Sequence, residues 1–531
     1  MAPLLRYLQT IRHLRPRQVW YRLWRPLQKR FYKEKAAPGE AIRTALNRPQ
    51  QGLQSFRPHD IYDPSAHAFT LLNLSAAYPQ AVNWNDDRHG ALWAFHLNYF
   101  GWLEDERLST DARFGTIREY VAAQDEIAVG LSAYTISLRS IAWIRFFLRH
   151  GVAEASALRL LYRHLARLYH FPEYEIDGNH LWENGCALLA GGLYFEEAAF
   201  YKQGLAILQE AIRDQLADDG MHLEASPMYH SLLLQRLLIC LELSGKLQPD
   251  EAAPAFLRDA AAKMLGWLAG FAFKGGAWAM VNDAAPGVAP SLEELTDFAA
   301  GLGIHAKPLA PQSHYRVYRN DVFELVMDVG NITPPWQPGH HHADALSFCL
   351  NSSSSPVIVD AGISAYRPSA LRDFQRSTNA HNTVSVAGRS SSDVWKSFRI
   401  GRRAKVRILH EGPADISAEH DGYGVYGICH RRNISFGVDK IIIEDQLKGL
   451  KRQKAFLHLH FHPDIQIKKI GENEYGTQDL RIMFKGTLSV GVESYTFAPE
   501  LNDTREASRL VIAVTAYTTT TIERITTTNA D

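Results

Sequence analysis

Three short segments of the sequence gather residue types that can move protons or bind metal ions. They are Asp177–Gly185, Asp219–His230 and Gly339–Phe348. In the first two, an Asp-Gly turn leads into an apolar pattern of helical spacing, which predicts that Asn179 and Tyr229 lie in the first turns of helices. Purely structural roles stay open, because Asn179 can cap a helix and Tyr229 can fill a groove.

The third segment contains the consecutive residues His340, His341 and His342. In an extended chain, residues two apart face the same side, so His340 and His342 are expected to point together. A pair of this kind is typical of a metal site or an acid–base site. Asp360 and His381 follow at the ends of predicted strands, and with His342 they make a nitrogen and oxygen ligand set that Zn²⁺ accepts. Because these ligands are dispersed, their spacing alone does not establish the site.

The elements that must position these residues change type along the chain. Residues 1–89 are expected to be a basic helical segment followed by a turn-rich linker. Over 90–310, leucine, alanine and aromatic residues recur at spacings of three and four, which predicts stacked helical hairpins, as in an incomplete α/α toroid. Over 311–531, two-residue alternation and short β-branched runs predict an antiparallel β-sandwich.

Composition limits the classes of function. The 531 residues imply two or more domains, and 57 Lys and Arg balance 57 Asp and Glu. A net charge of zero argues against nucleic acid or a densely sulfated polymer as partner and favours a moderately acidic one. The four cysteines show no CxxC spacing and are expected to be buried free thiols, which favours a reducing compartment.

The N-terminal segment suggests where the chain works. It shows no signal-peptide pattern and the chain has no long apolar run, so a cytoplasmic or membrane-peripheral location is expected rather than secretion. Residues 1–35 carry ten Lys and Arg against one acidic residue, interleaved with Trp20, Trp24 and other aromatic residues. This segment is expected either to lie on an anionic membrane or to pack on the body of the protein. The oligomeric state is not predicted.

The chemical segments resemble the heparinase II/III family of polysaccharide lyases, which is related to oligoalginate lyases. The matching stretches, in the order of the family, are 179–184, 219–230, 339–348, 359–362 and 376–384. The resemblance implies an α/α toroid followed by a β-sandwich, with the active site between them. It also implies that Asn179, Tyr229 and His340 are catalytic.

The same resemblance implies further site residues and a substrate class. His342, Asp360 and His381 match the ligands of a structural Zn²⁺. His180 and Glu183 match positions that line the cleft in some relatives, and His222 and Arg376 are also expected to bind substrate. The implied substrate is an acidic polysaccharide or oligosaccharide, here expected to be a capsule or exopolysaccharide of the producing cell.

The implied reaction explains these residue types. β-Elimination removes the C5 proton of a uronate, so the carboxylate must be neutralised, as Asn179 can do by hydrogen bonding. A base takes the proton and an acid protonates the departing O4, and Tyr229 and His340 are the candidates in either order. Two other functions stay open. One is a glycoside hydrolase in which Glu183 or Glu224 activates water, and the other is a non-catalytic glycan-binding or assembly factor.

Overall fold

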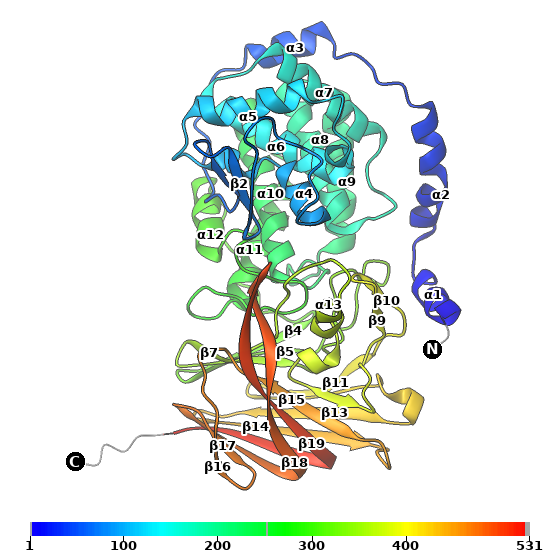
Figure 1. The fold of residues 1–531 in the computed structure, drawn as a ribbon, viewed down its shortest axis with the longest axis vertical. Coiled ribbons are helices and arrows are strands. Elements are labelled where there is room, and N and C mark those ends of the chain that lie inside the picture. Colours follow the sequence, from blue (N-terminus) through cyan, green and yellow to red (C-terminus); the bar gives the residue numbers. More distant parts are fainter. Residues whose placement is uncertain (1–2, 251–252, 526–531) are drawn as a thin grey trace, which may run out of the picture.

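The computed structural model describes residues 3–250 and 253–525. A helical half and a sheet half are stacked along the long axis of the molecule, and two N-terminal helices stand along one flank (Figure 1). The predicted fold class, a helical toroid followed by an antiparallel sandwich, is confirmed. Within the described ranges, the structure contains no helix long and apolar enough to cross a membrane.

The helical half is a set of hairpins around the buried helix α8. Its helices are α4 (Ala91–Leu97), α5 (Thr110–Ala122), α6 (Ala133–His150), α7 (Ala155–His170), α8 (Gly178–Phe195), α9 (Ala198–Gln215), α10 (Pro227–Leu247), α11 (Ala255–Phe271) and α12 (Leu292–Gly301). α8 packs against α6, α7, α9 and α10. It is buried around nearly its whole circumference, as expected for a helix enclosed by others. Serine side chains cap the first turns of α5, α6, α10 and α12, which fixes where those helices begin.

The segment before the toroid contains more structure than a linker. It forms α1 (Pro3–Ile11), α2 (Pro16–Phe31) and α3 (Gly39–Leu46), and then an antiparallel sheet of β1 (Ile61–Asp63), β2 (Ala68–Leu71) and β3 (Leu74–Ala77). The buried ring of Phe69 in β2 lies 4.6 Å from that of Trp102. The predicted linker is therefore wrong over these strands. They are short and divided by turns, so tertiary packing decides their conformation.

The sheet half is a sandwich of two antiparallel sheets. The smaller sheet has the order β4 (Tyr315–Arg319), β5 (Phe323–Asp328), β6 (Phe348–Ser352) and β7 (Ser355–Ile358). The larger sheet runs in the order β11 (Val406–Glu411), β12 (Asp415–His420), β13 (Cys429–Phe436), β14 (Lys440–Lys448), β19 (Asp503–Arg524), β18 (Leu480–Glu500), β17 (Glu474–Gly476) and β16 (Lys468–Gly471). β15 (Ala455–His460) pairs with β19 and with β8 (Val384–Val386). Leu325 and Leu350 of the smaller sheet share one core with Ile443 and Leu510 of the larger.

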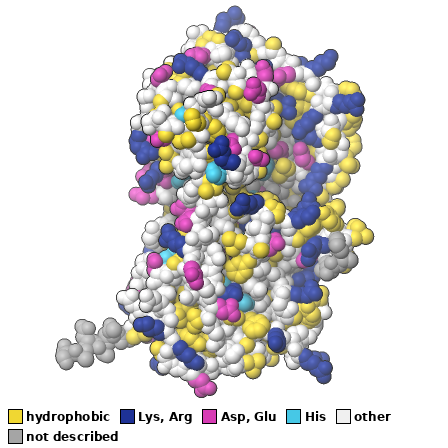
Figure 2. Space-filling view, in the orientation of Figure 1, with side chains coloured by type: hydrophobic (Ala, Val, Ile, Leu, Met, Phe, Trp, Pro, Cys, Tyr) yellow, Lys and Arg dark blue, Asp and Glu magenta, His cyan; other side chains and the backbone are white. Residues whose placement is uncertain are grey.

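Short elements join the two halves. Helix α13 (Ala370–Gln375) and the two-stranded sheet of β9 (Val394–Trp395) and β10 (Arg399–Ile400) lie on the side of the sandwich that faces the helices (Figure 1). The space-filling view narrows at this level (Figure 2). The loops that carry the third chemical segment belong to this junction.

Candidate active site

Asn179, Tyr229 and His340 converge where the two halves meet. Asn179 is the second residue of α8 and Tyr229 the third of α10, so the predicted helix starts are confirmed. The Nδ2 atom of Asn179 lies 3.3 Å from Nε2 of His340. The rings of Tyr229 and His340 have centroids 3.9 Å apart. Because α8 and α10 pack side by side, their first turns present the amide and the phenol to one imidazole.

The Asp-Gly turn before Asn179 makes room for this arrangement. Gly178 has a φ of +58°, and a side chain there would collide with Gln337 and Glu224. Glycine is therefore required for both its backbone angle and its lack of a side chain. The cap of α8 is the side chain of Asp177, which accepts from the backbone N–H of Gly178. This leaves the amide of Asn179 free of a capping role and directed into the junction.

Glu224 holds that amide in place. Its carboxylate accepts from Nδ2 of Asn179 at 2.8 Å, from the backbone N–H of Asn179 at 3.1 Å and from Nε2 of Gln337 at 3.2 Å. Burial raises the pKa of Glu224, but neighbouring histidines and the hydrogen bonds from Asn179 lower it overall. Glu224 is thus an ionised carboxylate that orients Asn179.

His340 is held in one tautomer by its two neighbours. Its Nδ1 lies 3.0 Å from a carboxylate oxygen of Asp283, and its Nε2 faces the donor amide of Asn179. A carboxylate accepts and an amide N–H donates, so Nδ1 carries the proton and Nε2 presents a lone pair. The geometry makes Nε2 a proton acceptor.

Asp283 connects the two halves through this histidine. It lies in the loop after α11, is fully buried, and also accepts from Nε2 of His342 at 2.8 Å. Arg372 of α13 donates two hydrogen bonds to it, at 2.5 and 2.7 Å. Burial opposes the charge, but Arg372 and the hydrogen bonds from the two histidines lower the pKa of Asp283 well below its ordinary value. Sequence reasoning missed Asp283. The available signal was the polar pair Asn282-Asp283 inside an apolar loop.

An aromatic wall surrounds the phenol. The hydroxyl of Tyr229 lies 3.2 Å from that of Tyr366, whose ring packs 5.4 Å from Phe398. Burial, and then the Tyr366 hydroxyl, raise the pKa of Tyr229 well above its ordinary value. Tyr229 therefore stays a protonated donor at neutral pH. Phe398 is 42% exposed and offers a flat face beside His340.

His180 and Glu183 lie on the same helix as Asn179. His180 is partly exposed, its Nδ1 lies 3.0 Å from Glu173, and its ring contacts Tyr134 at 4.4 Å. Burial lowers the pKa of His180, but the Glu173 carboxylate raises it overall. The buried carboxylate of Glu183 accepts hydrogen bonds from Nε of Arg236 at 3.1 Å. Burial raises the pKa of Glu183 to about 7, against the effect of Arg236.

Two of the predicted substrate-binding residues, His222 and Arg376, have buried side chains. His222 donates from Nε2 to Oε1 of Gln215 at 3.1 Å, and its ring packs on Trp182. Arg376 is buried and donates to the backbone carbonyl of His341 at 3.0 Å. Both side chains fix neighbouring protein groups in this structure, and their contact with substrate stays a prediction. Their motif positions are close in sequence to the site, but their side chains point into the protein.

The three predicted zinc ligands lie together in loops beside the ends of strands. His342 precedes β6, Asp360 follows β7, and His381 precedes β8. Nδ1 of His381 is 2.6 Å from Asp360, and the His342 and His381 rings have centroids 5.4 Å apart. As these side chains are turned, no three His, Cys, Asp or Glu residues in the described part of the chain form a ready metal cluster.

The donor set nevertheless suits Zn²⁺. Nδ1 of His342 and Nε2 of His381 are buried and have no hydrogen-bond partner among the described residues. Burial lowers the pKa of His342 to about 4, so its ring is neutral, as a metal ligand must be. The bond from Nε2 of His342 to Asp283 leaves Nδ1 as the free lone pair, which is the usual carboxylate–histidine arrangement behind a metal ligand.

Both halves of the chain match models of a known protein family. Residues 127–300 match the model described as heparinase II/III N-terminus, and residues 305–526 match heparinase II/III-like, C-terminal. Among solved structures, a heparinase III superposes with a TM-score of 0.67 at 16% identity, covering 93% of this chain and 86% of that one. A mutant heparan sulfate lyase from Pedobacter heparinus gives a TM-score of 0.57 at 16% identity, covering 96% and 88%. A chondroitin AC lyase from Streptomyces coelicolor A3, in complex with chondroitin sulphate, gives 0.51 at 11% identity, covering 96% and 83%. A search among curated proteins found no match.

The chain joins a helical toroid to an antiparallel sandwich and matches both heparinase II/III models, which makes it a polysaccharide lyase. The two family matches together span most of the sequence, and the chain belongs to the heparinase II/III family.

Proposed function

We propose that this lyase cleaves a uronate-containing polysaccharide by β-elimination. The observation that carries the proposal is the convergence of Asn179, Tyr229 and His340, with Nδ2 to Nε2 at 3.3 Å and ring centroids at 3.9 Å. An amide, a phenol and an imidazole at one point supply a carboxylate-binding group, a proton donor and a proton acceptor.

Asn179 would bind the uronate carboxylate. One N–H of its amide is held by Glu224, so the other is directed to the His340 side, where the sugar would lie. A hydrogen bond to the carboxylate stabilises the charge that develops when the C5 proton leaves. The ionised Glu224 fixes this direction before substrate arrives, so no reorganisation is needed.

His340 and Tyr229 would move the protons. Nε2 of His340 takes the C5 proton, the C4–O4 bond breaks, and the electron pair of the C5–H bond forms the C4–C5 double bond. The phenol of Tyr229 gives its proton to O4. The proton on Nε2 then passes to the phenolate, which restores both groups. Asp283 stabilises the imidazolium that exists between these steps.

His342, Asp360 and His381 would hold one Zn²⁺. The ion would supply fixed positive charge and order the loop that contains His340, two residues from His342. No step of the elimination requires it to bind or activate water.

The proposed substrate is a moderately acidic glycan, such as a capsule or exopolysaccharide of the producing cell. The relatives in solved structures include a heparan sulfate lyase and a chondroitin AC lyase, which supports a polymer with uronate units. The net charge of zero favours a polymer without dense sulfation.

Product analysis tests the proposal. The protein is incubated with unsulfated and sulfated uronate polymers, including heparosan, heparan sulfate, chondroitin and alginate, and products are followed by ultraviolet absorbance and mass. Unsaturated products that disappear with His340→Ala are expected. Saturated products would identify a hydrolase, and binding without any product would identify a glycan-binding factor, so either result refutes the proposal.

A further inference from the structure

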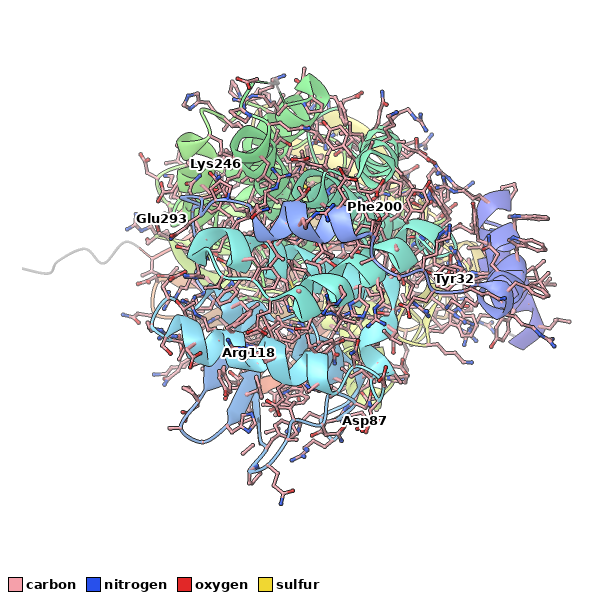
Figure 3. All side chains as sticks on the ribbon, turned by 90° about the horizontal axis from the view of Figure 1, so that it is seen from above. Tyr32, Asp87, Arg118, Phe200, Lys246 and Glu293 are labelled. Atoms are coloured by element: carbon pink, nitrogen blue, oxygen red, sulfur yellow. The ribbon has the colours of Figure 1, made fainter. Side chains whose placement is uncertain are left out.

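Helices α1 and α2 expose their apolar residues to solvent. In α2, Trp20, Leu23 and Phe31 are 59%, 76% and 73% exposed, and Val19, Trp24 and Leu27 share the same face. The rings of Trp20 and Trp24 stack at 5.9 Å. Seen from above, the N-terminal helical segment stands to one side of the molecule, beyond Tyr32, and its outer side chains are directed away from the body (Figure 3). An ordinary surface helix buries its apolar side and exposes its polar side, whereas these helices expose their apolar side.

The face of α2 that touches the protein is polar. Gln18 and Arg25 are its buried residues, and Arg25 donates to Glu175 at 2.8 Å. Arg17 pairs with Asp177 at 3.1 Å and also with Glu210. The helix is thus attached by ion pairs, by hydrogen bonds and by stacking of the Tyr21 ring on Tyr174 at 4.9 Å, and the side that carries Trp20 and Leu23 remains exposed.

Helix α1 repeats this inverted arrangement on the sheet half. Arg6 donates to Asp393 at 2.9 and 2.8 Å, and the ring of Tyr7 meets that of Trp395 at 4.7 Å. The residues on the outside are again apolar, and they are Leu4, Leu5, Leu8 and Ile11. The two helices therefore form one apolar flank, here called the N-terminal flank, that spans both halves (Figure 1).

The charge around the N-terminal flank is positive. The exposed basic residues on and beside the two helices are Arg12, Arg22, Lys29, Arg30, Lys33 and Lys35. Residues 1–35 contain one acidic residue, Glu34. Dark blue and yellow side chains accordingly lie together along this side of the molecule (Figure 2). Exposed Trp and Leu flanked by Lys and Arg match the interfacial zone of an anionic bilayer, where rings and aliphatic chains insert and cations meet lipid headgroups.

We propose that the N-terminal flank binds the surface of an anionic lipid membrane. The helices lie in the plane of the interface and do not span it. Bilayer binding covers the apolar residues that the protein leaves exposed, and the polar inner face keeps the helices attached to both halves. Arg17 also pairs with Asp177, and Arg15 lies 3.6 Å over the ring of Trp336, so the flank contacts segments that lead to Asn179 and His340. The membrane surface is thereby held close to the candidate active site.

Vesicle binding tests this assignment with the full chain. Cosedimentation is measured with vesicles of phosphatidylglycerol and phosphatidylcholine, and with phosphatidylcholine alone, at low and high salt. Strong binding to the anionic vesicles, weakened by salt, is expected. The affinity of the variant Trp20→Ser/Leu23→Ser/Leu27→Ser for these vesicles should fall by about 100-fold or more, because three inserting side chains are lost. The affinity of Lys29→Gln/Arg30→Gln should fall about tenfold for anionic vesicles and should not change for phosphatidylcholine vesicles.

A matched control uses apolar residues exposed elsewhere. Leu488 and Val492 of β18 are 74% and 52% exposed, and Leu488→Ser/Val492→Ser should bind vesicles as the parent protein does. All variants should keep the parent thermal midpoint, since the substituted side chains are exposed. Equal binding by the triple variant and the parent would overturn the proposal. So would a dimer in sedimentation equilibrium that the triple variant abolishes, because the flank would then bind a second copy.

Discussion

Replacing Asp283 by asparagine tests how the two halves build one site. The carboxylate accepts from His340 and His342 on its two oxygens, and Arg372 donates to both of them. Asparagine keeps the shape but has one acceptor oxygen and one donor nitrogen. At least one of these donors then faces an N–H₂ group, and the charge that stabilises the imidazolium of His340 is lost.

The structure sets two separate magnitudes. Arg372 is 1% exposed, and removing one partner of a buried ion pair costs about 3–5 kcal/mol in the free energy of unfolding. Loss of an oriented proton acceptor lowers kcat by about 10²–10⁴-fold. Asp283→Asn is expected to show both effects.

A second substitution separates them. In Asp283→Asn/Arg372→Met, the unpaired charge is gone and the methionine keeps apolar contact with Tyr366 and Phe398, over which Arg372 lies at 5.2 and 5.7 Å. Removing both partners of a buried pair is often close to neutral, so the double variant should regain most of the lost stability. It should remain inactive, because His340 still lacks its carboxylate.

The assay is urea unfolding together with ultraviolet detection of unsaturated product, corrected for folded fraction. Glu242→Gln is the matched control, since Glu242 is a buried carboxylate that pairs with Arg145 at 2.8 Å inside the toroid. It should lose comparable stability and keep kcat. Normal kcat in Asp283→Asn, or recovery of activity in the double variant, would refute the role given to Asp283.

Three further predictions follow from other contacts. Tyr229→Phe removes the proposed acid and should lower kcat by about 10²–10⁴-fold, whereas Tyr366→Phe, which keeps that acid, should cost less than about tenfold; equal losses in steady-state kinetics would contradict the assignment. Burial opposes ionisation of Glu104, but Arg145 and its neighbour Arg149 lower the pKa of Glu104 to about 2 from an ordinary 4.5. The ionised Glu104 should therefore stabilise the fold by about 3 kcal/mol above about pH 4.5. This contribution should be lost as the pH falls to about 2. Unfolding curves of Glu104→Gln should lack this acid-dependent part, and an unchanged pH dependence would argue against it. Metal analysis should find about one zinc per chain and none in His381→Ala, with a lower thermal midpoint; zinc retained by the variant would exclude His381 as a ligand.

Local patterns in the sequence were sufficient for the order and type of the main elements. The Asp-Gly turns before Asn179 and Tyr229 and the helical spacing after them predict helix starts, and these depend on residues within one or two turns. Two-residue alternation likewise predicts the strands of the sandwich. The strands β1–β3 were missed because they are short and irregular in pattern, and are fixed by packing of Phe69 in the toroid core.

The tertiary structure decided which side chains meet. Asp283 lies 57 residues from His340 and 89 from Arg372, and no local periodicity encodes such contacts. The same holds for His222 and Arg376, which lie in or beside the chemical segments but point inward.

Orientation also decided the character of the N-terminal segment. The sequence shows that α1 and α2 are basic and amphipathic, which allowed either a membrane or the body of the protein as their partner. Only the fold shows that acidic residues on both halves bind the arginines and leave the apolar faces outside. The physical reason is general: helix and strand formation depend on near neighbours in sequence, whereas the direction of a side chain depends on what the rest of the chain places around it.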